Sequence, residues 1–277
     1  MHRLKQLITI LLMLTSIVVP AEEVPHVSVN LIPLVEHVIP GEPLELAVVF
    51  KMVNNWHIYW QNPGEAGMST SFEWNLPEGF ELITELEPAP TRLREEEVTT
   101  FIHEDEAIYV FTLQPPAELS DTVQIGLRID WLECKSICLA GYDSLTAVLP
   151  VNPAPFNPPL ELIHLRMKAL SRIPVVSSEM IKKVSIGGDS LSLIFKGFPK
   201  GFQGLEKIDF FPFDELMYDI EHPPRLQRGF WRDQIIIPLL PEREMNPQVL
   251  KGVLAVRPST PKSAKTQYYQ IHQSVLP

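Results

Sequence analysis

The clearest pattern in the chain is an alternation of apolar and polar residues on either side of two cysteines. Every second residue of "VQIGLRIDW" (123–131) is apolar, which is the period of a β-strand with one buried face. A second alternating run extends from Leu145 to Val151. Because the cysteines lie between the two runs, the segment "CKSICLAGYD" (134–143) is predicted to contain the turn of a β-hairpin.

Short strand-like runs recur through the first half of the chain. Residues 44–53 and 107–113 are rich in aliphatic and aromatic residues, and turn sequences such as "VIPGEP" and "LPEGF" accompany them. Many short strands with frequent turns are typical of two antiparallel sheets packed face to face. Residues 22–151 are therefore predicted to form an all-β sandwich.

A proline-rich segment changes the pattern after this sandwich. "PVNPAPFNPP" (150–159) has five prolines in ten residues, which disfavour helices and central strands. Helical spacing comes next, with Asn157 expected as the N-cap and Pro158 as the first helical residue. Residues 152–173 are thus predicted to be a linker ending in one short helix. The expected apolar face of that helix consists of Leu160, Ile163, Met167 and Leu170.

Strand-like runs return beyond the linker. They are "LSLIFKGF" (191–198), "EKIDFFPF" (206–213), "QIIIPLL" (234–240) and "GVLAVR" (252–257). Residues 174–277 are predicted to form a second, smaller β-sandwich-like domain.

The first 21 residues have the pattern of a secretory signal peptide. Basic residues precede an apolar run over residues 7–19, and Ala21 fits a small-residue cleavage site. The run is shorter than the roughly 18 to 20 apolar residues that span a bilayer. The mature protein is therefore expected to be exported and not to insert into a membrane.

Charge is distributed unevenly along the chain. Residues 22–151 contain 22 acidic and 5 basic residues, a net charge of −17, whereas residues 152–277 contain 12 acidic and 16 basic residues, a net charge of +4. The acidic half would repel phosphates, so no nucleic-acid partner is expected. The asymmetry is compatible with steering of a basic partner, with docking of the two halves on each other, or with solubility alone.

The two cysteines, Cys134 and Cys138, allow three interpretations. A structural disulfide would close a loop of about five residues and stabilise the fold by only about 2 kcal/mol. Two thiolates with His57 or His103 would suit a soft ion such as Cu(I), although no set of four ligands with recognisable spacing is present. An exchanging pair would lie at an exposed turn, where an incoming thiolate can attack one sulfur and the other can resolve the mixed disulfide.

Neighbouring side chains bear on the redox interpretation. Lys135 lies beside Cys134 and would favour its thiolate, whereas Glu133 would oppose it. Residues 94–109, "REEEVTTFIHEDEAIY", are expected to form a long acidic connection with Phe101 in its middle. Phe101 would either cover the cysteines until a partner displaces it or be buried at the start of the next strand.

Two stretches resemble a known family. "NNWHIYWQNPGEAGMSTSFEWNLPEGF" (54–80) and "DWLECKSICLAGYDSLTAVLPV" (130–151) are similar to the periplasmic N-terminal region of the DsbD-type transmembrane disulfide reductases, particularly the ScsB branch. The likeness continues through "IDFFPF" (208–213) and "LKGVLAV" (250–256). It covers most of the expected mature chain.

The resemblance implies an immunoglobulin-like sandwich that acts in the periplasm. Cys134 and Cys138 match the family's redox pair, Tyr59 falls where the family has a tyrosine near the disulfide, and Phe101 falls in the region of its aromatic cap loop. Three residues separate the cysteines, as in the ScsB branch and fewer than in DsbD itself. The spacing therefore leaves open whether DsbD's partners apply to this chain.

A second departure concerns the other domains of the family. The full-length family continues into a multi-span membrane domain and a thioredoxin-like domain, and this sequence contains neither. A separately encoded membrane disulfide reductase is therefore expected to supply electrons, and thioredoxin-fold periplasmic proteins are the other expected partners.

The favoured function is that of a protein-disulfide oxidoreductase component, which relays reducing equivalents by thiol–disulfide exchange without a cofactor or metal. Two alternatives stay open. One is an adaptor or chaperone whose disulfide is structural, and the other is a Cu(I)-handling protein, suggested by the soft ligands and the ScsB resemblance. Sequences typical of phosphate-binding loops, zinc proteases and nucleophile elbows are absent.

Overall fold

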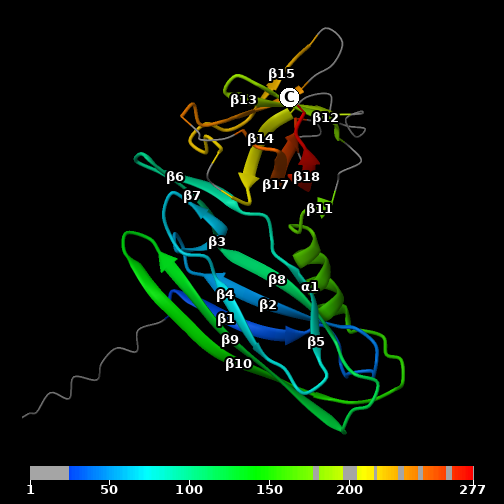
Figure 1. Cartoon of the computed structure of the whole chain (residues 1–277). Coiled ribbons are helices and arrows are strands. Elements are labelled where there is room, and N and C mark those ends of the chain that lie inside the picture. The colour runs from blue at the N-terminus through cyan, green and yellow to red at the C-terminus, as the bar shows by residue number, and fades with distance from the viewer. Residues whose placement is uncertain are drawn as a thin grey trace, which may run out of the picture.

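Strands dominate the computed structural model, which describes residues 25–176, 181–195, 205–214, 217–229, 234–242, 246–259 and 264–276. The predicted signal peptide lies outside these residues. Two sheets form a first domain, two further sheets form a second domain, and a short helix lies between them in the described sequence (Figure 1). The predicted fold class, an all-β sandwich followed by a short helix and a second β-domain, is confirmed.

The first domain consists of two packed sheets. One has the strand order β1-β2-β8-β5, and the other has the order β10-β9-β3-β7-β6, with β4 also paired to β9. Neighbouring strands in both sheets are antiparallel, as in immunoglobulin-like sandwiches. The strands are β1 (Val27–Pro33), β2 (Leu44–Met52), β3 (His57–Gly64), β4 (Ser71–Asn75), β5 (Glu81–Leu86), β6 (Thr91–Glu95), β7 (Val98–Glu104), β8 (Glu106–Gln114), β9 (Thr122–Cys134) and β10 (Cys138–Pro150).

The alternation along β9 supplies one wall of the first domain's core. The apolar residues at positions 123, 125, 127, 129 and 131 are each no more than 5% exposed. They pack against apolar side chains of β2 and β8, including Phe50 and Phe111. Burial of one face of each sheet is the main favourable term for a sandwich of this kind.

Strands β9 and β10 form the predicted hairpin. Their register pairs Thr122 with Pro150 at one end and Cys134 with Cys138 at the other. Residues 135–137 make the turn, where the Lys135 amide donates a hydrogen bond to the Ile137 carbonyl at 3.0 Å. The ladder is therefore continuous up to the two cysteines, which form its last pair.

The segment 94–109 is not a loop. It contains the end of β6, a turn at residues 96–97, all of β7 and the start of β8. The prediction of a long connection was wrong because the acidic cluster at residues 95–97 obscured two short strands. Strand β7 pairs with β3, a strand distant in sequence, so no local pattern identifies its partner.

The linker helix α1 (Leu160–Leu170) begins later than predicted. Its N-cap is Pro159, without a side-chain cap hydrogen bond, so the assignments of Asn157 as cap and Pro158 as first helical residue were wrong. A residue that precedes a proline is disfavoured in helical geometry. Because Pro158 precedes Pro159, the helix cannot readily start there.

The helix also packs through a different face. Leu160 and Met167, from the predicted apolar face, are 68% and 64% exposed. Instead Ala169 is buried with Leu165 against the outer face of the β1-β2-β8-β5 sheet. Partly exposed ion pairs from Arg166 to Glu45 and from Lys168 to Glu106 accompany this packing, so the helix turns its basic residues toward the acidic first domain.

The second domain also contains two sheets. Their strand orders are β11-β18-β17-β14 and β12-β13-β16-β15. Apolar side chains from both sheets form one core cluster, which also takes in Trp60, Ala89 and Phe101 of the first domain. The strands are β11 (Val175–Val176), β12 (Ile181–Gly187), β13 (Ser190–Phe195), β14 (Leu205–Pro212), β15 (Arg225–Gln227), β16 (Gln234–Pro238), β17 (Val249–Pro258) and β18 (Gln267–Ser274).

Ion pairs between the domains run against the overall charge asymmetry. Arg92 of the acidic first domain pairs with Asp209 of the second, and Arg94 pairs with Glu221. In these described ion pairs the acidic first domain supplies the basic residue and the basic second domain supplies the acidic one. Within the described ranges, no helix is long and apolar enough to cross a membrane.

A buried cluster of titratable groups lies where β5, β7 and β8 meet the linker. The Tyr109 hydroxyl donates a hydrogen bond to the Glu87 carboxyl at 3.2 Å, and His103 Nε2 lies 3.6 Å from the same oxygen. Burial raises the pKa of Glu87 from 4.5 to about 8, and the nearby Glu85 carboxylate adds to the rise. Burial lowers the pKa of His103 to about 3, with Arg172 acting in the same direction. Glu87 is therefore protonated and His103 neutral near pH 7.

This cluster predicts a pH-dependent stability that Glu87→Gln should remove. Between pH 4.5 and about 8 the folded protein keeps a proton on Glu87 that the unfolded chain has released. The free energy of unfolding therefore falls by about 1.4 kcal/mol per pH unit as pH rises through this window. Over pH 7 to 8, where His103 is neutral in the folded protein and mostly neutral in the unfolded chain, wild type should lose about 1 kcal/mol relative to Glu87→Gln.

Urea unfolding at several pH values measures this difference. Glu81→Gln, on the exposed surface of β5, is the matched control. Its free energy of unfolding should differ from that of wild type by the same amount at every pH. If the free energy of unfolding changes with pH equally in wild type and Glu87→Gln, Glu87 is ionised in the folded state.

Candidate functional site

Cys134 and Cys138 form a disulfide at the end of the β9–β10 hairpin. The two cysteines differ in accessibility, since Cys134 is 2% exposed whereas Cys138 is exposed. Direct pairing places both side chains on the same face of the sheet, but only Cys134 has neighbouring strands on both sides of its own and packs with Tyr59 and Ile102. Cys138 begins β10, the outermost strand of its sheet.

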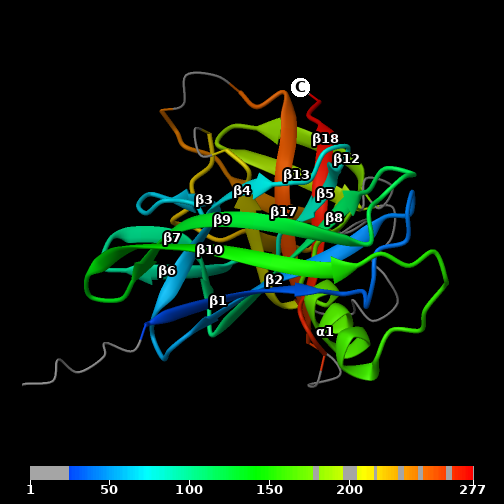
Figure 2. The ribbon, with the colours of Figure 1, turned by 90° about the horizontal axis from the view of Figure 1, so that it is seen from below.

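A pocket of about 870 Å³ opens over the disulfide. Its lining includes the cysteine turn, residues 134–138, and the end of the β6–β7 hairpin, through Glu95, Glu96 and Val98. The floor includes His57 and Tyr59 of β3. Both hairpin ends lie at the same end of the first domain (Figure 2). The disulfide is thus reached through a pocket with an acidic wall.

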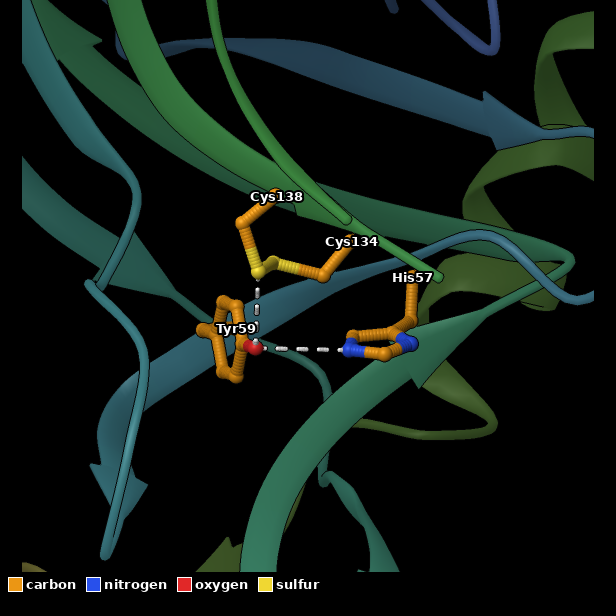
Figure 3. The surroundings of a disulfide bond; sticks show 4 residues. All are labelled: His57, Tyr59, Cys134 and Cys138. Atoms are coloured by element: carbon orange, nitrogen blue, oxygen red, sulfur yellow. Dashed lines mark hydrogen bonds between the residues drawn. A yellow bond between two sulfur atoms is a disulfide. The ribbon is translucent and has the colours of Figure 1, made fainter. Parts of the chain in front are cut away.

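Two side chains of β3 point toward the disulfide (Figure 3). The Tyr59 hydroxyl lies 4.0 Å from Cys138 Sγ, and His57 Nε2 lies 3.5 Å from that hydroxyl. Their spacing of two residues places both on one face of the strand. Gly67 makes room for the tyrosine, because its φ is +107° and a Cβ there would lie 2.2 Å from the Tyr59 ring.

The local environment keeps both of these side chains uncharged near neutral pH. Burial raises the pKa of Tyr59, and the Glu95 carboxylate adds to the rise. Burial lowers the pKa of His57, with Glu95 opposing the change. Tyr59 is therefore a neutral hydroxyl donor held beside the exposed sulfur, and a neutral imidazole lies behind it.

A family profile matches the part of the chain that contains this site. A profile described as "Thiol:disulfide interchange protein DsbD, N-terminal" matches residues 29–150, which include both cysteines and all of β9 and β10. Residues 29–150 form a DsbD N-terminal-type domain. No curated protein sequence matched the chain.

One solved structure extends the likeness beyond the DsbD N-terminal-type domain. The N-terminal periplasmic domain of ScsB from Proteus mirabilis has a TM-score of 0.61 at 15% identity, and the match covers 91% of this chain and 96% of that one. The reduced N-terminal domain of DsbD from Neisseria meningitidis matches 44% of this chain and 83% of its own, with a TM-score of 0.30 and 10% identity. The two-domain fold is therefore similar to that of the ScsB domain.

Phe101 does not cap the disulfide in the DsbD N-terminal-type domain. It is 0% exposed in β7, and its ring packs edge-on against Phe211 of the second domain at 5.2 Å. The cap assignment was wrong because alternation along β7 turns Phe101 away from the cysteines. The same alternation turns Thr100 into the pocket and Ile102 onto Cys134.

Lys135 and Glu133 are adjacent to Cys134 in sequence but have other partners. Glu133 is 8% exposed and accepts a hydrogen bond from Trp131 Nε1 at 3.0 Å, on the strand face opposite to Cys134. His26 Nδ1 lies 3.2 Å from the same carboxylate. Lys135 is exposed, lines the pocket and reaches the Asn54 carbonyl at 3.5 Å. Of the two charged side chains expected to act on Cys134, only Lys135 lines the same pocket as this cysteine.

Sequence reasoning missed the residues that bury Cys134. Ile102, from β7, forms one buried apolar cluster with Tyr59 and Cys134, and Leu93, from β6, packs against this cluster. Glu95, at the end of β6, lines the pocket. The period-2 pattern of residues 91–104 contained this information, because it places Leu93, Glu95 and the even-numbered residues of β7 on one face. Among the residues that the structure describes, no group of three or more His, Cys, Asp or Glu side chains is arranged to hold a metal ion.

Proposed function

We propose that this protein is a periplasmic thiol–disulfide exchange module, which relays reducing equivalents from a separately encoded membrane disulfide reductase to thioredoxin-fold proteins. The observation that carries the proposal is the asymmetry of the disulfide, with Cys138 open to the pocket and Cys134 buried beneath it. A disulfide of this kind offers one sulfur to an incoming thiolate and shields the other.

The reductive half of the cycle begins at Cys138. A thiolate of the reduced partner attacks Cys138 Sγ, a new partner–Cys138 S–S bond forms, and the Cys134–Cys138 bond breaks with its electron pair on Cys134. The partner's second thiolate then attacks its own sulfur in the mixed disulfide. The partner leaves as a disulfide, and Cys134 and Cys138 remain as a dithiol after proton uptake.

The oxidative half reverses the roles. Cys138, as thiolate, attacks the disulfide of an oxidised thioredoxin-fold protein, and one partner sulfur leaves as a thiolate. Cys134 then attacks Cys138 Sγ, which restores the Cys134–Cys138 bond and releases the second partner thiolate. Two electrons and two protons have passed to the partner, and no further reactant is needed.

Tyr59 supports these steps from the pocket floor. Its hydroxyl stays protonated because burial and Glu95 raise its pKa, and it lies 4.0 Å from Cys138 Sγ. A neutral donor beside sulfur stabilises the thiolate without blocking the line of attack. Lys135, at the exposed turn, adds a positive charge at the pocket edge.

Equilibration with glutathione tests the proposal. The disulfide is expected to have a reduction potential above about −300 mV and to be reduced and reoxidised while the protein stays folded. The measurement is the dithiol fraction at a series of glutathione ratios, with circular dichroism recorded on the same samples. A potential well below that value would favour the structural disulfide of an adaptor or chaperone.

A further inference from the structure

The β6–β7 hairpin lies between the second domain and the disulfide. In Figure 1 its strands lie on the side of the first domain that faces β14 and β17. Because side chains alternate along both strands, one face of the hairpin contacts the second domain and the other contacts the cysteine site. The register pairs Arg92 with Phe101 on the first face and Leu93 with Thr100 on the second.

Arg92 is the main polar contact on the second-domain face. Its guanidinium donates hydrogen bonds to both carboxylate oxygens of Asp209, with the closest nitrogen–oxygen distance 2.6 Å. It also donates to the carbonyls of Phe210 and Ile220. The side chains of Arg92 and Asp209 are only 12% and 5% exposed, so this charge pair is largely shielded from water.

Aromatic packing surrounds this ion pair. The Arg92 guanidinium lies 5.1 Å from the centre of the Phe101 ring and 5.9 Å from that of Phe211. Trp60, on the neighbouring strand β3, contacts both rings. The hairpin is thus held to the second domain by a buried ion pair within an aromatic cluster.

The opposite face of the hairpin covers Cys134. Ile102 is buried in one apolar cluster with Cys134, Leu93 packs against that cluster, and the hairpin end lines the pocket through Glu95 and Val98. Cys138, in contrast, is already exposed and is not part of this buried cluster. A displacement of the hairpin would therefore uncover Cys134 and change the access to Cys138 much less.

We propose that the second domain determines which sulfur reacts, by holding the β6–β7 hairpin over Cys134 through Arg92. Arg92 is then a positioning residue that acts on the cysteine site through Leu93 and Ile102. The inference rests on the proposed exchange at Cys138 for its functional meaning. In this proposal the second domain controls the cysteine site by positioning the hairpin, without itself contacting a partner protein.

Alkylation of single thiols tests the inference without any partner protein. In the Cys138→Ser background, Cys134 is the only thiol, and iodoacetamide should modify it slowly. Adding Arg92→Gln should accelerate this modification by about tenfold, because local opening of the hairpin exposes buried groups. In the Cys134→Ser background, Arg92→Gln should change the modification of Cys138 by less than about twofold.

Arg94→Gln is the matched control. Arg94 lies two residues along the same strand and pairs with Glu221 of the second domain, but the two side chains are 44% and 43% exposed. Exposed pairs of this kind contribute little, so Cys134 should stay slow in this variant. Equal acceleration by Arg94→Gln, or no acceleration by Arg92→Gln in the folded protein, overturns the inference.

Hydrogen exchange on the unmutated protein covers the case in which Arg92→Gln unfolds. The amides of β6 and β7 should exchange together with those of β14, because the second domain holds the hairpin. Faster, independent exchange of the hairpin while β14 stays protected contradicts the proposal. Neither result depends on the reduction potential, so failure here is distinct from failure of the exchange function.

Discussion

Replacing Cys138 by serine is expected to abolish thiol–disulfide exchange, whereas replacing Cys134 by serine should leave a protein that captures partners through Cys138. The reason is the difference in burial between the two cysteines, 2% exposure for Cys134 against an exposed Cys138. Without Cys134 the mixed disulfide at Cys138 has no internal thiol to resolve it. The complex should therefore accumulate.

Non-reducing electrophoresis measures the capture, with a thioredoxin that lacks its resolving cysteine and whose remaining cysteine carries a thionitrobenzoate group, which leaves as a thiolate when Cys138 attacks. The Cys134→Ser protein should form a covalent complex with it, and the Cys138→Ser protein should form none above the level of a variant with neither cysteine. Ser136→Ala, in the exposed turn between the cysteines, is the control and should exchange as wild type does. Efficient capture through Cys134 in the folded Cys138→Ser protein would reverse the proposed order of attack.

Phe101→Ala is expected to destabilise the protein by about 3 to 5 kcal/mol, the usual cost of removing a fully buried aromatic side chain. Phe101 is 0% exposed and packs on Trp60 and Phe211, with the Arg92 guanidinium above its ring. The truncation leaves a cavity where the two domains meet. It also weakens the support of the β6–β7 hairpin.

Urea unfolding followed by tryptophan fluorescence measures this loss. Val98→Ala is the matched control on the same strand, since Val98 is 42% exposed and its truncation should cost less than about 0.5 kcal/mol. A Phe101→Ala protein with wild-type stability and a faster-reacting disulfide would instead support the rejected role of Phe101 as a cap.

The outcome at Phe101 shows where sequence reasoning failed. The family resemblance located the correct segment, because the end of the β6–β7 hairpin does border the disulfide. It assigned the wrong residue, because a phenylalanine in an acidic stretch suggested a mobile loop. Once residues 91–104 are known to be two paired strands, alternation alone directs Phe101 to the second domain and Ile102 to Cys134.

The prediction for the linker helix failed for a related reason. Its sequence contains two candidate apolar faces, and spacing favoured the one with Leu160 and Met167. The packed face, with Leu165 and Ala169, was selected by contact with the outer face of a sheet and by ion pairs to Glu45 and Glu106. Helical periodicity describes a helix in isolation and does not include the surface on which it lies.

The sequence by itself determined the β9–β10 hairpin, the cysteines at its end and the all-β class, because each depends on a local period-2 pattern. Only the tertiary structure decided that Cys134 is buried and Cys138 exposed, that Arg92 of an acidic domain pairs with Asp209, and that a proton stays on Glu87. These features depend on neighbours distant in sequence, which set burial and charge at each side chain and which local patterns do not encode.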